Sequence, residues 1–404
     1  MSELDAGRIS IGRGKIPCMR RRPFMPTASV LVALGLLVAA CSGDEPEPES
    51  APTTSPAPTS APATPEPSTP TPTPTPTTEP GPVVPAEFED VATGFDVPWG
   101  LAFLPDGSAL LSERDSARIL RVSDTGQVTE VGTVAGVSPV GEGGLLGIAV
   151  APDSADSVYA YFTAADDNRV VRMPYQNGAL GDAEIIIDGI PRAGIHNGGR
   201  ITFGPDGMLY IGTGDASEAG RAQDRDSVAG KILRLNPDGS VPADNPFDGS
   251  PVFSYGHRNV QGLAFDDDGN LWASEFGQNT WDELNLIQAG QNYGWPLVEG
   301  VGNDDRFVDP VAQWSTTEAS PSGIAYVRDT VFMAALRGER LWQIPVRDGT
   351  AGTPADFAVG EYGRLRHAEA APDGSLWVLT SNTFRGDPRE GDDRILRVTL
   401  QAEE

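Results

Sequence analysis

The sequence is poor in the residue types that carry much of protein chemistry. Of its 404 residues, two are cysteine and three are histidine. Both cysteines, Cys18 and Cys41, lie near the N-terminus, so the rest of the chain has neither a disulfide nor a thiolate metal site. Basic residues are also few: 29 Lys and Arg stand against 57 Asp and Glu, which leaves a formal net charge of −28. This balance argues against nucleic acid and against adhesion to anionic membranes.

Several sequence signatures are also missing. The chain has no phosphate-binding Walker A loop, no Gly-x-Gly-x-x-Gly dinucleotide fingerprint and no Gly-x-Ser-x-Gly nucleophile elbow, which argues against P-loop nucleotide hydrolases, Rossmann enzymes and serine esterases. The C-terminal three quarters also lack any long helical periodicity. This absence favours an all-β fold.

The N-terminus has the pattern of an export signal. Arg20–Arg22 precede an apolar run from Ala28 to Ala40, which is shorter than the about 20 residues that a membrane-spanning helix needs. The run ends in Val-Ala-Ala-Cys41 and resembles a bacterial lipobox. Residues 1–41 are therefore predicted to be a lipoprotein signal, with lipidated Cys41 as the first mature residue and the protein outside the cell membrane, held by its lipid anchor only. An ordinary signal peptide with a chance cysteine is the alternative.

Residues 42–85 consist almost entirely of Pro, Thr, Ser, Ala and Glu. Such a segment buries too little apolar surface to offset its ordering entropy, and proline stiffens it, so we predict a disordered tether. Residues 86–404 are the globular body. Two questions on the leader stay open: Arg21–Met25 weakly resembles a twin-arginine signal, and Met19 is an alternative start.

One pattern recurs through the body: an apolar run, a turn with Pro or Asp-Gly, and then an alternating strand with an aromatic residue. Its six turn aspartates are Asp106, Asp153, Asp206, Asp268, Asp329 and Asp373. Asp-Gly between apolar runs is a strong hairpin signal, because glycine supplies φ > 0. Hairpins that repeat at intervals of roughly 40 to 60 residues are typical of propeller blades. The sequence therefore predicts a six-bladed β-propeller; a β-sandwich with chance turns is the alternative.

The first cluster that could carry chemistry surrounds His196, in Gly-Ile-His-Asn-Gly-Gly-Arg directly before a predicted strand. A histidine in such a loop can take a proton from a substrate hydroxyl near neutral pH. Asp215 ends the following strand and is placed to orient the imidazole. A structural histidine is the competing interpretation.

The second cluster is cationic. Arg258 and Asn259 lie in Tyr-Gly-His-Arg-Asn-Val-Gln-Gly, a pairing that suits a planar anionic ligand. Farther along the chain, Arg364 and Arg366 can share one face of a strand, since residues i and i+2 do so, and Arg337 also stands among small and apolar residues. Together these residues predict a pocket for a ligand with several carboxylates. A loop-bracing arginine is the alternative for Arg258.

The third cluster contains oxygen ligands. Carboxylates, amides and turn residues fill Glu275–Asn285, and Asn292–Pro296 follow in the sequence Asn-Tyr-Gly-Trp-Pro. Such oxygens suit calcium, although the spacing is not that of an EF-hand. Acidic loops are also often merely solvated, which is the alternative.

Taken together and in this order, these motifs resemble the soluble glucose dehydrogenases and bacterial aldose sugar dehydrogenases that depend on pyrroloquinoline quinone (PQQ), the glucose/sorbosone dehydrogenase-like family. The resemblance extends from Val97–Leu101 to Arg394–Val398. It implies a six-bladed propeller, in agreement with the independent repeat count. It also implies an oxidoreductase that passes hydride from an aldose to PQQ and forms a lactone, with the protein supplying orientation and charge.

The resemblance assigns roles to individual positions. The family's general base matches His196 and its orienting aspartate matches Asp215. The Arg-Asn pair that binds the cofactor matches Arg258 and Asn259. The residues that hold the PQQ carboxylates match three more positions. These are Arg337, Arg364 and Arg366, with Arg340 as an alternative to the first, where the family can have lysine.

The resemblance also implies two calcium ions. One bridges PQQ through main-chain carbonyls that match Gly277 and Gln278, where the family has Gly-Pro; carbonyl ligation survives this change. A second, structural calcium uses a Glu and a Tyr that match Glu283 and Tyr293.

One departure concerns the cofactor site. Where some family members have a glutamine that contacts PQQ, this chain has Glu142, and a carboxylate beside an anionic quinone repels it unless it is protonated or turned away. Two other functions remain as alternatives: a calcium-dependent lactonase, and a non-enzymatic lipoprotein that binds a sugar or a partner protein. For the enzyme, the expected partners are a sugar substrate and an unidentified electron acceptor.

Overall fold

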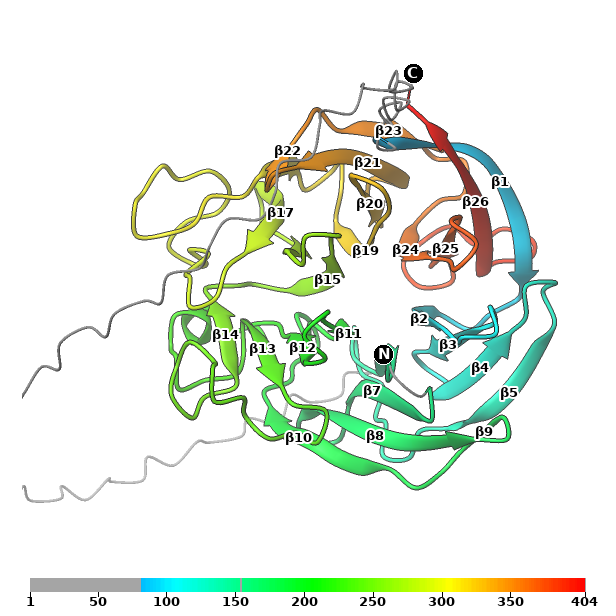
Figure 1. Ribbon diagram of the computed structural model, residues 1–404, viewed down its shortest axis with the longest axis horizontal. Helices are drawn as coiled ribbons and strands as arrows, with labels where there is room; N and C mark the ends of the chain where they lie inside the picture. The colour runs from blue at the N-terminus through cyan, green and yellow to red at the C-terminus, as the bar shows by residue number, and fades with distance from the viewer. Residues whose placement is uncertain (1–80, 153–154, 404) are drawn as a thin grey trace, which may run out of the picture. The chain divides into compact units, whose positions relative to one another are not determined.

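The computed structural model describes residues 81–152 and 155–403, and within them nearly all regular secondary structure is β-strand. Six antiparallel sheets surround a central axis, as Figure 1 shows. The only helix among the described residues is a short 3₁₀ turn, η1 (Ala219–Ala222). The prediction of an all-β six-bladed propeller is confirmed. The predicted signal and most of the tether lie in residues 1–80, outside the described part of the chain.

Three blades come from the first half of the body. The first blade contains β2 (Pro98–Phe103), β3 (Ala109–Glu113), β4 (Arg118–Val122) and β5 (Val128–Thr133). The second contains β6 (Leu145–Val150), β7 (Ser157–Thr163), β8 (Asn168–Gln176), β9 (Ala179–Leu180) and β10 (Glu184–Ile190). The third contains β11 (Ile201–Phe203), β12 (Leu209–Gly212), β13 (Lys231–Leu235) and β14 (Val252–Tyr255).

The other three blades follow. The fourth contains β15 (Val260–Phe265), β16 (Leu271–Glu275), β17 (Trp281–Ile287) and β18 (Ala312–Ser315). The fifth contains β19 (Pro321–Tyr326), β20 (Thr330–Ala335), β21 (Arg340–Arg347), β22 (Thr350–Ala351) and β23 (Ala355–Phe357). The sixth contains β24 (Leu365–Ala370), β25 (Leu376–Thr380), β26 (Arg394–Ala402) and β1 (Val83–Thr93).

The sixth blade closes the ring. Its outermost strand β1 comes from the beginning of the body and pairs antiparallel with β26 at the end, so that the blue and red strands run side by side in Figure 1. β1 begins at Val83 rather than near residue 86, where the composition changes. Val83 is fully buried, pairs with Ala402 and donates its main-chain N–H to Thr330 Oγ1 at 3.1 Å. The sheet thus includes the last residues that composition assigned to the tether.

The repeated turns join the first two strands of each blade. Asp106 lies between β2 and β3, and Gly107 after it has φ +83°, which only glycine adopts without strain. Asp373 lies between β24 and β25, where its carboxylate accepts the N–H of Ser375 at 3.0 Å. In the degenerate fifth copy, Asp329 itself adopts φ +54°. The turn residue Asp153 of the second blade lies outside the described residues.

The core lies between the blades. Each of the six buried apolar clusters draws mainly on two neighbouring blades, so that Leu111 of the first blade shares a cluster with Leu379 of the sixth, and Ile232 of the third with Leu271 of the fourth. Burial of each leucine side chain contributes about 1.5–3 kcal/mol. Because every blade is bounded on two sides, the loops at the ends of the strands rest on a rigid ring.

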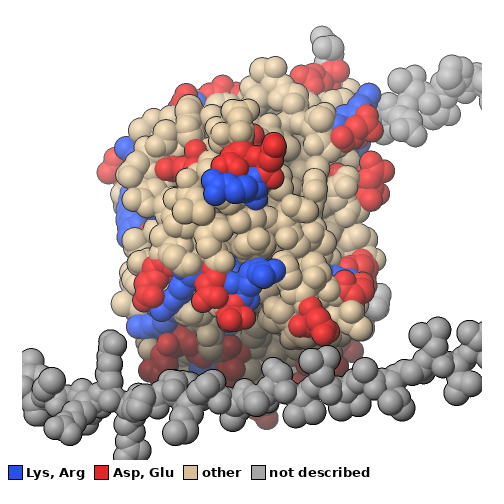
Figure 2. Space-filling model, turned by 90° about the vertical axis from the view of Figure 1, so that its left-hand side faces the viewer, with Lys and Arg blue, Asp and Glu red and all other residues tan. Residues whose placement is uncertain are grey.

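The outer surface carries charges of both signs. On the side of the propeller shown in Figure 2, acidic and basic side chains are interspersed among wide neutral areas. Among the described residues, no helix is long and apolar enough to span a bilayer.

Candidate active site

A pocket of about 460 Å³ lies at the end of the axis where the first strand of each blade begins and the second ends. All six blades contribute to it. Its lining residues are Trp99, Arg114, Glu142, His196, Arg258, Asn259, Gln261, Phe276, Gly277, Ser320, Leu336, Arg337, Arg364, Arg366, Phe384 and Arg385. Eight of the residues predicted from sequence are among them, although they come from five different blades. We refer to this pocket as the mouth pocket.

His196 and Asp215 are paired, as predicted. His196 Nδ1 lies 2.8 Å from Asp215 Oδ1, and on the other side of the ring Arg258 Nη2 lies 2.9 Å from His196 Nε2. Because a guanidinium can only donate, Nε2 must accept, and the ring proton is therefore on Nδ1 and is donated to Asp215. The imidazole thus presents an unprotonated Nε2 on the side of Arg258, which itself lines the mouth pocket.

Asp215 is held in place by other donors. It is 1% exposed; Trp295 Nε1 donates to its Oδ2 at 2.9 Å, and the N–H of Ser217 donates to Oδ1 at 2.8 Å. Burial by itself would raise the pKa of Asp215, but the hydrogen bonds from His196, Trp295 and Ser217 outweigh it and hold the pKa below its usual range. The carboxyl is therefore ionised at neutral pH and can stabilise an imidazolium.

The loop that carries the histidine has a special backbone. His196 itself has φ +59°, which is uncommon for a residue with a side chain. Asn259 Oδ1 accepts the N–H of Gly198 at 2.9 Å, and Glu142 Oε2 accepts the N–H of His196 at 3.2 Å. Asn259 therefore supports the histidine loop, beyond the contact with a cofactor that the resemblance implies.

The arginines of the mouth pocket fall into two groups. Arg114 pairs with Asp115 at 2.7 Å and Arg385 with Glu142 at 2.6 Å. The other four have no carboxylate within ion-pair distance among the described residues. They are Arg258, Arg337, Arg364 and Arg366, the four that were predicted from the sequence to hold an anionic ligand.

Burial of the unpaired charges of Arg258, Arg364 and Arg366 costs free energy. Burial lowers the pKa of Arg366 to about 9, with the neighbouring charges of Arg364 and Arg114 adding to the effect, and burial lowers the pKa of Arg258 as well. The Nε atoms of Arg258, Arg364 and Arg366 are buried without a hydrogen-bond partner. A ligand with several carboxylates would compensate the positive charge and would also supply hydrogen-bond acceptors for these Nε atoms. The alternative Arg340 points elsewhere, since its guanidinium pairs with Asp356 at 2.7 Å.

The loop 276–281 offers main-chain oxygens beside the arginines. Glu299 Oε1 accepts four consecutive N–H groups, from Gln278 to Trp281, at 2.7 to 3.2 Å. Asp282 Oδ1 accepts the N–H of Gly277 at 2.9 Å. With their N–H groups engaged, Gly277 and Gln278 have carbonyl oxygens that accept no hydrogen bond from any described residue. Gly277 lines the mouth pocket, whereas the side chain of Gln278 is exposed.

Glu283 and Tyr293 meet at a separate, smaller cavity of about 10 Å³, which Glu275 and Glu299 also line; this is close to the space of one water molecule. Burial raises the pKa of Glu283, and the nearby charge of Glu275 adds to this shift. Among the described residues, no three His, Cys, Asp or Glu side chains are arranged to hold a metal. A cation in this cavity would therefore have to use main-chain oxygens as well.

Several residues of the site were missed from the sequence. Gln261 and Trp295 could have been found, because each lies in a motif already singled out. Arg114 and Arg385 follow strands in loops without any recognisable pattern. Only the fold brings these two arginines to the pocket.

The structure is a six-bladed propeller with a histidine–aspartate pair and an arginine-rich pocket at one end of its axis, which places a base beside groups that can bind an anionic ligand. The comparisons with known proteins identify the family. The model of the glucose/sorbosone dehydrogenase family matches residues 95–386, and the chain belongs to this family.

Relatives in this family agree with the motifs. The PQQ-bound aldose sugar dehydrogenase of Streptomyces coelicolor is 57% identical, with a TM-score of 0.76 over 79% of this chain and 100% of that one. Aldose sugar dehydrogenase YliI of Escherichia coli is 29% identical over 71% of this chain and 88% of its own length. Quinoprotein glucose dehydrogenase B of Acinetobacter calcoaceticus is 34% identical over 54% of each chain. The family resemblance drawn from the motifs is confirmed.

Proposed function

We propose that this protein oxidises aldose sugars to lactones with PQQ and calcium, and that His196 is the general base. The observation that carries the proposal is the arrangement in the mouth pocket: an imidazole with an unprotonated Nε2 stands beside four guanidinium groups that have no carboxylate partner. The first feature removes a proton, and the second holds an anionic cofactor.

The protein's share of the chemistry follows from the His196–Asp215 pair. Nε2 accepts the proton of the sugar's anomeric hydroxyl, and the ionised Asp215 stabilises the imidazolium that forms. Arg258 must release Nε2 for this step, and a cofactor carboxylate or carbonyl oxygen gives its guanidinium a better acceptor. Bound PQQ would supply the two-electron acceptor that takes the hydride from the sugar carbon.

The residues present fit PQQ. It carries three carboxylates, and the buried, unpartnered Nε atoms of Arg258, Arg364 and Arg366 offer it charge-assisted hydrogen bonds. Arg337 is more exposed and stands at the edge of the same pocket. The PQQ-bound state of the 57% identical relative supports the same cofactor here.

Calcium fits the loop 276–281 because the carbonyl oxygens of Gly277 and Gln278 accept no hydrogen bond and hard cations prefer such ligands. Calcium there would supply Lewis-acid polarisation of the quinone. A second calcium fits the small cavity at Glu283 and Tyr293, where it would neutralise a buried carboxylate.

The test is dye-linked oxidation of a panel of aldoses by purified apo-protein, with PQQ and calcium added separately and together. We expect turnover only with both. Titration calorimetry with calcium present should show PQQ binding. If no PQQ binding is detected, the enzyme proposal fails and a non-enzymatic binding protein becomes the better interpretation.

We also propose that the enzyme is exported and anchored through a lipid on Cys41, with residues 42–85 as its tether. The support is the apolar run that ends in Val-Ala-Ala-Cys before a Pro/Thr-rich segment. Mass spectrometry of the mature N-terminus should find a lipidated Cys41, and Cys41→Ser should yield unlipidated protein. A wild-type N-terminus without lipid contradicts the proposal.

A further inference from the structure

One ion pair crosses the mouth pocket between blades that are not neighbours. Glu142 Oε1 lies 2.6 Å from Arg385 Nη1. Glu142 precedes β6 of the second blade and Arg385 follows β25 of the sixth, so the pair passes over the first blade. Both residues line the mouth pocket, and Glu142 is the only carboxylate among its lining residues.

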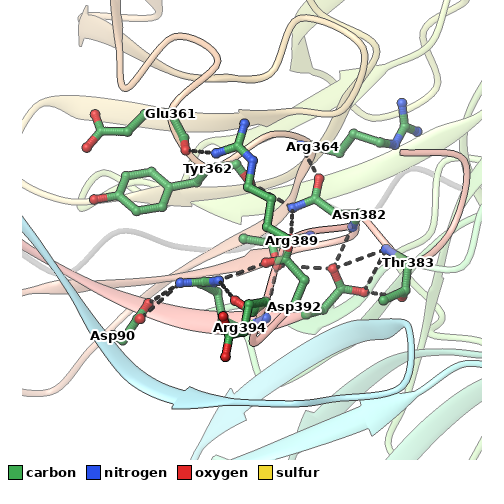
Figure 3. Close-up of polar contacts among 12 residues, drawn as sticks. Asp90, Glu361, Tyr362, Arg364, Asn382, Thr383, Arg389, Asp392 and Arg394 are labelled. Atoms are coloured by element: carbon green, nitrogen blue, oxygen red, sulfur yellow. Dashed lines mark hydrogen bonds and ion pairs between the residues drawn. The ribbon is translucent and has the colours of Figure 1, made fainter. Parts of the chain in front are cut away.

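The segment that carries Arg385 is firmly held. Figure 3 shows Asn382 between the main chains of Arg364 and Tyr362, to which it is bonded at 2.8 Å each. Thr383 bonds to Asp393 through its hydroxyl. The ring of Phe384 contacts two guanidinium groups, that of Arg114 at 3.6 Å and that of Arg385 at 4.8 Å from its centre. Arg385 therefore has a defined position above the pocket, although its side chain is half exposed.

The other oxygen of Glu142 serves the histidine loop. Its Oε2 accepts the N–H of His196, and its own N–H is donated to the carbonyl of Gly194 at 2.9 Å. The carboxylate thus supports the left-handed backbone of His196 with one oxygen and binds Arg385 with the other. An amide at this position could also accept the N–H of His196, but it would carry no charge.

We propose that Arg385 is a positioning residue that neutralises the charge of Glu142. With this ion pair in place, the chain can hold an anionic cofactor even though the carboxylate of Glu142 lines the mouth pocket. The inference rests on the proposed function. Where some family members have a neutral glutamine, this chain has two opposite charges. Without Arg385, the free charge of Glu142 would face the carboxylates of the cofactor across a partly desolvated pocket, where charges interact strongly.

Four proteins test the proposal: wild type, Arg385→Gln, Glu142→Gln and the double variant. The measurement is PQQ affinity by titration calorimetry in calcium-containing buffer. Arg385→Gln should weaken PQQ binding at least about tenfold, because it exposes a like charge. Glu142→Gln should bind PQQ at least as tightly as wild type. The double variant should recover to within about twofold of Glu142→Gln, since a neutral side chain needs no partner.

A matched control removes an exposed arginine from an ion pair at the other end of the strands. Arg347 pairs with Asp329 at 3.2 Å and is 68% exposed; Arg347→Gln should leave PQQ affinity unchanged. Melting temperatures of all five proteins report on folding. Arg385→Gln can be compared in the wild-type chain and in the Glu142→Gln variant. If it weakens PQQ binding equally in both, or in neither, Arg385 does not act by neutralising Glu142. If wild type itself does not bind PQQ, the proposed function fails, which is a separate outcome.

Discussion

Two cavities lie along the axis of the propeller, and they differ in how their charged side chains are partnered. The second one, which we call the axial cavity, has a volume of about 350 Å³ and is lined by the first strands of all six blades. Three of its polar side chains meet at one atom: Arg200 Nη1 lies 3.5 Å from His367 Nε2, and the same nitrogen lies 3.0 Å from Glu369 Oε2. In the mouth pocket, four arginines have no carboxylate partner among the described residues, whereas the axial cavity contains one such arginine, Arg200.

The comparison distinguishes Arg200, whose contacts support the fold, from Arg366, which is available to bind a ligand. Arg200 donates Nε to the carbonyl of Gln261 at 2.8 Å and lies over the ring of Trp99 at 4.3 Å, and only its Nη2 is buried without a partner. Arg366 also contacts Gln261, but through the side chain. Its Nη1 donates to Gln261 Oε1 at 3.0 Å and to Ser322 Oγ at 3.3 Å, and neither acceptor is charged. A buried cation with incomplete partners in a rigid pocket is typical of a binding site.

The largest effect is expected for His196, the proposed general base in the mouth pocket. His196→Gln keeps size and hydrogen bonding but removes basicity, so turnover should fall roughly 10²- to 10⁴-fold, with PQQ affinity and melting temperature little changed. Asp215→Asn should cause a smaller loss because the base remains. His367→Gln in the axial cavity should lower stability and leave turnover per folded molecule near normal. Near-normal turnover of His196→Gln would remove His196 from the mechanism.

The second test exchanges one arginine in each cavity. Arg366→Gln should weaken PQQ binding by roughly 10- to 100-fold, the value of a charge-assisted contact of about 1.5–3 kcal/mol. It should not lower the melting temperature of the apo-protein, since it removes an unpaired buried charge. Arg200→Gln should lower the melting temperature and retain PQQ affinity. Calorimetry measures the PQQ affinity and thermal unfolding measures the melting temperature of each variant. Equal changes in both variants would contradict the assignment of Arg366 to ligand binding and Arg200 to the fold.

A third, smaller effect concerns the loop 276–281. Glu299→Ala removes the acceptor of four N–H groups, so the carbonyl oxygens of Gly277 and Gln278 lose their fixed position. The calcium concentration that half-saturates PQQ binding should rise several-fold, whereas PQQ affinity at saturating calcium should change little. Glu318→Ala is the matched control, because this exposed carboxylate serves only its own turn at Ser315. An unchanged calcium requirement would show that Glu299 does not support the calcium site.

The smallest effect is a pH dependence in the axial cavity. Burial raises the pKa of Glu369 to about 8, with Arg200 opposing the shift. A carboxyl with a folded pKa above its unfolded value adds stability below the unfolded pKa, and this stability is lost as pH rises through about 8. Compared with wild type, Glu369→Gln should therefore become relatively more stable between about pH 5 and pH 8. Urea unfolding at several pH values measures the difference; a constant difference would refute the raised pKa.

Local patterns predicted much of this molecule. Each copy of the repeated pattern covers one hairpin, so the count of six blades followed from the repeat alone. His196 and Asp215 are joined by one hairpin, and the same hairpin brings them within 2.8 Å. Arg364 and Arg366 share one face of a strand by the two-residue period. In each case the interacting residues are close in the chain, and backbone geometry relates them.

Other features depended on contacts between blades. Arg337 and Arg340 are equally plausible in sequence, but the pairing of Arg340 with Asp356 turns it away from the pocket. His196 and Arg200 belong to one motif, and yet they line opposite cavities. The start of β1 at Val83 depended on its pairing with β26.

The sequence by itself therefore determined the blade count, the His196–Asp215 pair and the cationic character of the pocket, because short-range periodicity decides which side chains share a face or a turn. Only the tertiary structure decided which arginines remain without a partner and how Glu142 is neutralised. Glu142 and Arg385 are 243 positions apart, and nothing in either local sequence points to the other. Closure of the ring brings them together, and the balance of charge in the pocket depends on that contact.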